Sequence, residues 1–284
     1  MTLARERNFS VNDYCLAARE WHAGASIKVL ALHGWLDNAA SFNMLAGALK
    51  SVRLVALDLP GHGLSDHRSG DASYQIWDDL PQILDVLDQL GWDQCVMLGH
   101  SRGAMISTLL AASMPERVRA LVTLDGLIPY PFEDEKVITQ LRSYLLDRKK
   151  QSAKPLRVFE SHHDFIERRA RLGEPRIVAE QLAERNLRKT ENGYAWRGDP
   201  RLSGASAIKV NKTQCETILK SLEMPVLNLW AGDDSKLKKF MDTARSFAQT
   251  HIENLTSVEI AGHHHWHMEA ESAAEIADEI EAFL

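Results

Sequence analysis

Cysteine is scarce in this sequence of 284 residues, which contains only Cys15, Cys95 and Cys215. An odd number of widely spaced cysteines provides neither a disulfide framework nor the paired cysteines of a structural zinc site. Residues 1–8 lack the apolar core of a secretory signal, and Glu281–Leu284 carry no lipidation or peroxisomal address. These absences favour a cytoplasmic protein with buried, reduced thiols.

Long apolar runs and an excess of positive charge are absent as well. No stretch approaches about 18 uninterrupted apolar residues, so no membrane span is expected. The 33 Lys and Arg residues are outnumbered by 39 Asp and Glu, and the net charge of −6 argues against a nucleic-acid-binding protein. With 45% hydrophobic residues, the chain can bury a full core, as one large domain or as a domain with an insertion.

Short runs that are apolar at nearly every position recur along the chain, as is typical of parallel strands covered on both faces. Apolar stripes within residues 76–90 and 270–284 predict amphipathic helices. The strands are expected at Lys28–Leu32, Arg53–Leu57, Val96–Leu98, Ala120–Leu124, Val226–Trp230 and Ser257–Ile260. This alternation of strands and helices predicts an α/β fold with an open, doubly wound, mostly parallel sheet.

Residues 127–222 interrupt this alternation with a helical pattern and no convincing strand; helices are expected at Val137–Leu146, Phe165–Leu172 and Ile177–Asn186. The segment carries a net charge of +6, whereas the rest of the chain carries −12. We therefore expect a core formed by residues 1–126 and 223–284, with a helical cap inserted at 127–222. The basic residues would favour an anionic substrate, or they would simply form the solvated outer faces of the helices.

The pentapeptide Gly99–Gly103 (GHSRG) is the most informative motif in the chain. An apolar run leads into it and a helical stretch of small residues, Ala104–Ala112, follows it. Strand, G-x-S-x-G and helix together are the layout of a nucleophile elbow, in which glycines make room for a sharp turn. The sequence therefore predicts Ser101 as an exposed nucleophile above the sheet, at the N-terminus of a helix.

Four motifs follow one another in the order typical of the α/β-hydrolase fold. They are His33–Asn38 (HGWLDN), Asp58–Asp66 (DLPGHGLSD), Gly99–Gly103 and Gly262–His267 (GHHHWH). Over about residues 25–284 the chain resembles the α/β-hydrolase superfamily, and within it the serine hydrolase-like proteins, whose histidine-glycine-tryptophan loop is nearly reproduced. The resemblance implies a hydrolase and does not specify a substrate.

The general base is expected in the histidine-rich motif after the last strand. Similar proteins place the catalytic histidine five residues before an acidic or polar position; here Glu269 occupies that position and selects His264. His263 is the alternative, because many family members place the base directly after the glycine. Four histidines could also ligate a metal, but adjacent side chains diverge and no cysteine lies nearby. Neither a metal nor another cofactor is expected.

Two aspartates at strand ends could orient this base. Asp234, after the strand at 226–230, is at the usual location for this fold. Asp125 follows the strand at 120–124, where some members of the superfamily, including haloalkane dehalogenases, carry the acid. The serine hydrolase-like group often has an acidic residue followed by glycine there, and Ala231–Ser235 departs from the usual Gly-x-x-Asp pattern. Asp125 is therefore the favoured acid, and Asp234 remains the alternative.

Acyl transfer also needs N–H donors that face the developing oxyanion. The backbone N–H groups of Arg102, directly after the nucleophile, and of Trp35, in the HGW loop, are the candidates. The Trp35 side chain could line the substrate site or pack in the core. The Arg102 side chain could bind a substrate carboxylate or pair with one of the many acidic residues.

These residues predict a serine hydrolase that cleaves a carboxylic ester or a related acyl bond of a small molecule through an acyl-enzyme. Serine in place of aspartate at the elbow disfavours epoxide hydrolase and haloalkane dehalogenase chemistry. Carbon–carbon bond hydrolysis of a diketone, thioester hydrolysis and lactone hydrolysis use the same triad and remain alternatives. A catalytically silent ligand-binding protein is the alternative from another functional class.

Overall fold

The computed structural model describes residues 4–129, 131–151, 157–232 and 238–284. A central sheet of eight strands has the order β1-β2-β4-β3-β5-β6-β10-β11. Its strands are β1 (Arg5–Val11), β2 (Tyr14–Trp21), β3 (Ile27–Leu32), β4 (Val52–Leu57), β5 (Cys95–His100), β6 (Val118–Leu124), β10 (Val226–Ala231) and β11 (Leu255–Ile260). Strands β1, β2 and β4 pair antiparallel and the other pairs are parallel, so the predicted mostly parallel sheet is confirmed.

The hairpin of β1 and β2 was not predicted from the sequence, because its first strand has no apolar run. Charged side chains pair across it instead: Arg7 contacts Glu20 at 2.8 Å and Arg19 contacts Glu6 at 2.9 Å. Such cross-strand ion pairs stabilise an edge strand whose outer edge has no neighbouring strand.

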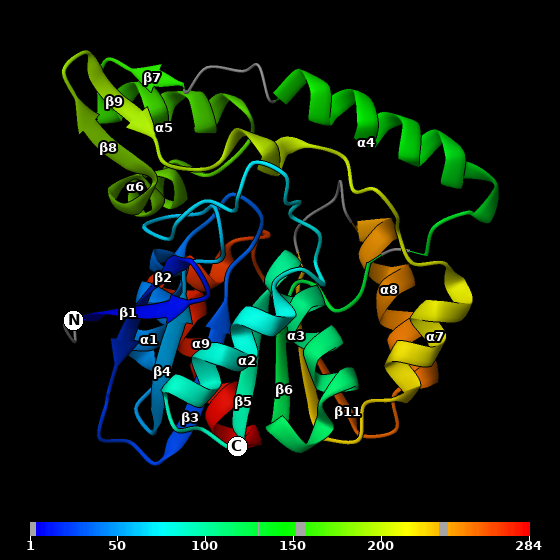
Figure 1. Cartoon of the computed structure of the whole chain (residues 1–284). Coiled ribbons are helices and arrows are strands. Elements are labelled where there is room, and N and C mark those ends of the chain that lie inside the picture. The colour runs from blue at the N-terminus through cyan, green and yellow to red at the C-terminus, as the bar shows by residue number, and fades with distance from the viewer. Residues whose placement is uncertain (1–3, 130, 152–156, 233–237) are drawn as a thin grey trace.

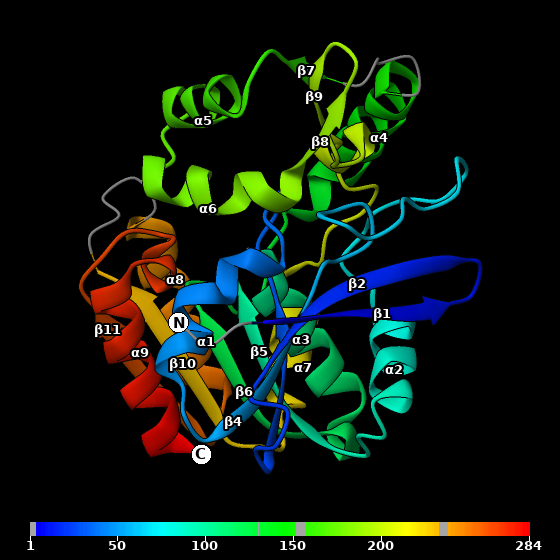
Figure 2. The same ribbon diagram turned by 90° about the vertical axis from the view of Figure 1, so that its left-hand side faces the viewer.

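Helices cover both faces of the sheet (Figures 1 and 2). Alternate residues of each strand face opposite sides: in β3, Leu30 and Leu32 join one core cluster and Val29 and Ala31 the other. The first cluster includes side chains of α2 (Leu80–Gln89), α3 (Arg102–Ser113), α7 (Lys212–Lys220) and α8 (Lys238–His251). The second includes side chains of α1 (Asn43–Ala48) and α9 (Ala270–Phe283).

A separate layer lies over one end of the sheet, at the top of Figure 1. It consists of α4 (Val137–Gln151), α5 (His162–Arg171), α6 (Arg176–Asn186) and a small sheet of β7 (Val158–Phe159), β8 (Leu187–Thr190) and β9 (Gly193–Trp196). The three expected helices are present, but the expectation of no strands here was wrong. Strands of two to four residues are too short to show an alternating pattern.

Helix α7 packs with the sheet and not with this upper layer. It contacts α3, and its Cys215 and Leu219 are fully buried in the larger core cluster. The division into core and cap at residues 127 and 222 stays a prediction, and the packing of α7 favours a cap that ends before this helix.

Short 3-10 helices complete the described elements: Ala39–Phe42, Pro115–Arg117, Asp134–Lys136, Pro200–Ser203 and Trp266–Met268. Within the ranges that the structure describes, no helix combines the length and the apolar character that crossing a membrane requires.

Candidate active site

Ser101 occupies a sharp turn between β5 and α3. Its φ of 52° and ψ of −113° are strained for a residue with a side chain. The turn is possible because two glycines flank it: a Cβ at Gly99 would lie 2.5 Å from the backbone of Ala104, and one at Gly103 would lie 2.0 Å from the carbonyl oxygen of Leu32. The predicted strand–turn–helix arrangement is therefore present, with Ser101 at the N-terminus of α3.

His264 lies between Ser101 and Asp125. Its Nε2 accepts from the Ser101 hydroxyl, with 3.0 Å between Nε2 and Oγ, and its Nδ1–H donates to Asp125 Oδ2. The Asp125 side chain is fully buried, whereas that of His264 is 26% exposed. Three side chains that are distant in the sequence thus form a continuous hydrogen-bonded chain that ends at a serine hydroxyl.

Asp125 is held firmly at the end of β6. It adopts a left-handed φ of 45°, and its backbone N–H donates to the carbonyl of Leu229 at 2.8 Å. Its second carboxylate oxygen accepts from the N–H of Ala231 at 3.1 Å. These bonds to β10 aim the first oxygen at His264. The alternative acid, Asp234, lies outside the described residues.

His263, the alternative base, has a different partner. Its Nε2 lies 2.9 Å from Glu269 Oε1, and its Nδ1 accepts from the backbone N–H of His265 at 3.0 Å. His267 is buried, and its Nε2 lies 2.7 Å from the Ser41 hydroxyl. Among the described residues, only His264 of this motif hydrogen-bonds to Ser101.

The loop after β3 is held by His33. Its Nδ1–H donates to the carbonyl of Gly34 at 2.7 Å, and its Nε2 accepts from the N–H of Leu59 at 3.0 Å. Burial lowers the pKa of His33, so the ring is neutral and both bonds have a fixed direction. Trp35, which follows, is 51% exposed, and its indole N–H donates to the carbonyl of Leu202 in the upper layer at 2.8 Å.

A cavity of about 300 Å³ opens at Ser101. It is lined by Gly34, Trp35, Leu36, Asp37, His100, Ser101, Arg169, Leu172, Glu174, His264 and His265. The Trp35 side chain therefore lines the candidate substrate site. The Arg102 side chain lies elsewhere, 3.2 Å from Asp79 Oδ2, while its backbone N–H belongs to the first turn of α3, where amides lack an acceptor within the helix.

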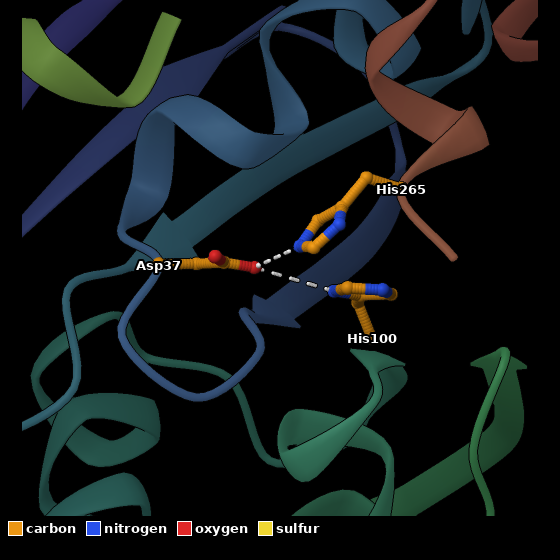
Figure 3. A group of neighbouring side chains, drawn as sticks. All are labelled: Asp37, His100 and His265. Atoms are coloured by element: carbon orange, nitrogen blue, oxygen red, sulfur yellow. Dashed lines mark ion pairs between the residues drawn. The ribbon is translucent and has the colours of Figure 1, made fainter. Parts of the chain in front are cut away.

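Sequence reasoning missed a buried cluster of Asp37, His100 and His265 beside this chain (Figure 3). Asp37 Oδ2 lies 3.3 Å from His265 Nε2 and 3.5 Å from His100 Nδ1. Burial opposes the ionised form of Asp37, but the positive charge of His265 is the largest opposing cause and holds the pKa of this carboxyl well below its usual range. Burial also opposes the charged form of His265, yet Asp37 raises its pKa, so the two form an ion pair.

His100 is neutral in this cluster, because burial lowers its pKa to about 4. A neutral ring has one N–H, and that N–H is on Nε2, which donates to the backbone carbonyl of His264 at 2.9 Å. Asp37 stands in the HGWLDN motif, but the motif alone did not indicate that this aspartate pairs with two histidines.

The same three residues are the set that could hold a metal ion, because each offers one ligand atom within 4.8 Å of the others. Their charges are already balanced, however. The His265 imidazolium faces one Asp37 oxygen, and the guanidinium of Arg169 lies 3.6 Å from the other. A transition metal would have to displace the proton of His265, so the described donors fit an ion-pair network better than a metal centre.

The family model of the α/β-hydrolase fold matches residues 28–271. A serine hydrolase-like protein of Dictyostelium discoideum is 32% identical over 278 residues, which cover 91% of this chain and 76% of that protein. Serine hydrolase-like protein 2 of Homo sapiens is 29% identical, with 95% of this chain and 90% of the relative covered.

Solved structures agree with this assignment. A hypothetical protein from Pseudomonas aeruginosa PAO1 superposes with a TM-score of 0.90 at 36% identity, and 98% of each chain is covered. The thioesterase domain from the curacin biosynthetic pathway superposes with a TM-score of 0.82 at 24% identity, over 98% of this chain and 99% of that domain, and shows a likeness of fold. The chain therefore belongs to the α/β-hydrolase family, with the serine hydrolase-like proteins among its relatives.

Proposed function

We propose that this protein is a serine hydrolase that cleaves a carboxylic ester or a related acyl bond of a small molecule. One observation carries the proposal: His264 contacts the Ser101 hydroxyl through Nε2 and Asp125 through Nδ1. A serine hydroxyl is a weak nucleophile at neutral pH, and an imidazole that accepts its proton activates it. The family supports hydrolase activity, and this geometry supplies a mechanism for it.

In this mechanism Ser101 Oγ attacks the acyl carbonyl carbon while its proton moves to His264 Nε2. Asp125 keeps the other ring nitrogen protonated and stabilises the imidazolium. The carbonyl oxygen becomes an oxyanion, for which the backbone N–H groups of Trp35 and Arg102 are the proposed donors. Collapse breaks the bond to the leaving group, which takes the proton from His264.

The resulting acyl-enzyme is then hydrolysed. Water attacks the ester carbonyl of acylated Ser101, and His264 accepts a proton from the water as it attacks. Breakdown of the second tetrahedral intermediate returns that proton to Ser101 Oγ and releases the carboxylic acid. We further propose that the upper layer acts as a cap, because Arg169 on α5 and Leu172 directly after this helix border the catalytic cavity.

A fluorophosphonate probe tests this proposal directly, because it phosphonylates only an activated serine. The wild-type protein is expected to be labelled at Ser101, as identified by mass spectrometry, and to hydrolyse p-nitrophenyl esters of short fatty acids. Ser101→Ala should lose both the labelling and the hydrolysis.

Ser113→Ala is the matched control, since Ser113 is an exposed serine on the same helix whose hydroxyl donates to the carbonyl of Leu109. It should be labelled like the wild type. A folded wild-type protein that is neither labelled nor active would contradict the proposal and support a ligand-binding protein without turnover. Circular dichroism establishes that each variant is folded.

A further inference from the structure

A second cavity, of about 500 Å³, adjoins the catalytic one. Leu36, Arg169 and Leu172 line both cavities. Because the same three residues border the two spaces, the cavities are immediate neighbours. A substrate bound at Ser101 that extends past these three residues would enter the second cavity.

The walls of this second cavity are largely apolar. Phe159 and Phe165 meet edge to face, with ring centroids 5.4 Å apart and planes at 89°, and Trp196 packs in the same small cluster. Leu172, at the junction with the catalytic cavity, is 76% exposed. An exposed leucine at the entrance of an aromatic cavity is suited to contact with an apolar part of a ligand.

Three arginines line this cavity, and their electrostatic situations differ. The guanidinium of Arg169 is paired with Glu174 in two hydrogen bonds, and Asp37 lies 3.6 Å away. Arg157, just before β7, and Arg168, on α5, make no ion pair or hydrogen bond through their guanidinium groups with any residue in the described ranges. Among the described residues, the charge of Arg169 is thus compensated, and the charges of Arg157 and Arg168 are not.

The two uncompensated guanidinium groups act on each other. Partial burial lowers the pKa of Arg157, and the positive charge of Arg168 lowers it further. Two like charges at the edge of an apolar cavity, neither of them paired with a carboxylate of the described residues, repel each other. An oxyanion placed between them would remove this repulsion and accept charge-assisted hydrogen bonds from both.

We propose that the substrate of this protein carries an oxyanion, separated by an apolar segment from the scissile acyl carbon. The apolar segment lies along Phe159, Phe165 and Trp196, and the oxyanion binds between Arg157 and Arg168. This inference rests on the proposed serine hydrolase function and names the chemical class of its substrate. A carboxylate, a phosphate and a sulfate share the required chemistry.

Matched ester series test the proposal. In one series, the acyl chains of p-nitrophenyl esters of increasing length end in a carboxylate, a phosphate or a methyl group. In the other, acetate esters of alcohols end in the same three groups, which places the anion on the leaving-group side. The wild type is expected to have the higher kcat/KM for an anionic terminus over methyl in at least one series.

Arg157→Gln combined with Arg168→Gln should reduce this anionic preference by about tenfold or more, the typical effect of losing hydrogen bonds to a charged group. The methyl-terminated esters are the internal reference, because the preference is the ratio of kcat/KM for the anionic terminus to kcat/KM for methyl in the same variant. Arg171→Gln is the matched control, because Arg171 lies on the same helix, is exposed and does not line the cavity. This control variant should retain the preference of the wild type.

The possible failures are distinguishable. If Ser101 is labelled and esters are hydrolysed, but the double variant retains the anionic preference of the wild type or the wild type has none in either series, this inference is wrong and the proposed function stands. If Ser101 is not labelled and no ester is hydrolysed, the proposed function itself fails and this inference fails with it. Preference for one oxyanion over the others identifies which source of negative charge the site selects.

Discussion

His100 donates its Nε2–H to the backbone carbonyl of His264 at 2.9 Å, and the two rings lie 4.8 Å apart between centroids. The residue that precedes the candidate nucleophile therefore holds the backbone of the candidate base. His100 ends β5 and Ser101 follows it directly. The same short segment therefore positions both Ser101 Oγ and, through the backbone of His264, the Nε2 atom that contacts it.

Replacing His100 should impair catalysis through the position of His264. His100→Phe retains a ring of similar size but loses the donor, so kcat should fall by up to about 100-fold, the effect of a small misplacement of a reacting group. KM should change much less than kcat, because the lost donor holds the backbone of His264 and does not itself bind the acyl group. Steady-state kinetics on a p-nitrophenyl ester measure both constants.

His100→Gln is the conservative control for this role, since its amide can still donate to the carbonyl of His264. It should retain more of kcat than His100→Phe. Equal activity of both variants with the wild type, or a rise in KM with kcat unchanged, would show that His100 does not act by positioning the base.

The choice between the two candidate acids can be tested on Asp125 and Asp234. Asp125→Asn removes the carboxylate that contacts His264 and should lower kcat by about four orders of magnitude. Asp234→Asn should change kcat little, because Asp125 already occupies the position beside Nδ1. Rapid hydrolysis by Asp125→Asn together with a large loss in Asp234→Asn would reverse this assignment.

Several features of the fold follow from local sequence, and others do not. The buried parallel strands were predictable because their residues are apolar on both faces, as at Val29 and Leu30 of β3. Ser101 was predictable because glycine on each side is a steric requirement of its turn. The strands β7, β8 and β9 were not, since each is too short to show a period.

Choices among neighbouring residues depended on tertiary structure. His263 and His264 are adjacent, so the residues alone did not decide which of them is the general base. The preference for His264 came from the family resemblance. The direction in which each ring points is decided by its partners, Glu269 for one and Asp125 for the other. Asp37 was noted only as part of the HGWLDN motif, because its pairing involves two histidines that follow it by many residues.

The Asp37–His265 ion pair predicts a dependence of stability on pH. His265 has a folded-state pKa above the unfolded value of about 6.5, because the Asp37 charge outweighs burial. Its contribution to the free energy of unfolding is therefore complete below that unfolded value and is lost as the pH rises through the folded-state pKa. Asp37, whose pKa is lowered, keeps its contribution until the pH falls below the usual carboxyl range.

Urea unfolding of the wild type and of His265→Gln measures this effect. The difference in the free energy of unfolding between the two should be largest below the unfolded pKa of about 6.5 and should decrease as the pH rises through the raised folded-state pKa. Comparison with the variant cancels the opposite contribution of His33, whose pKa is lowered by burial and does not depend on His265. A difference that is constant with pH would show that His265 is not charged in the folded protein.

Asp58 and Arg185 form a fully buried ion pair that joins the end of β4 to α6 in the upper layer, with 2.7 Å between Nη2 and Oδ2. The carboxylate also accepts from the backbone N–H groups of Ala39 and Leu64. Arg185→Met would leave this charge buried without its cation, and the free energy of unfolding should fall by about 3–5 kcal/mol.

The double variant Asp58→Asn with Arg185→Met should recover part of that loss, because no unpaired charge remains in the interior. Arg176→Met is the control on the same helix: its ion pairs with Glu167 and Glu180 are at the surface, so its effect should be much smaller. Urea unfolding of the four proteins gives the comparison. If Arg185→Met and Arg176→Met had the same free energy of unfolding, the buried ion pair would not stabilise the contact between α6 and the sheet.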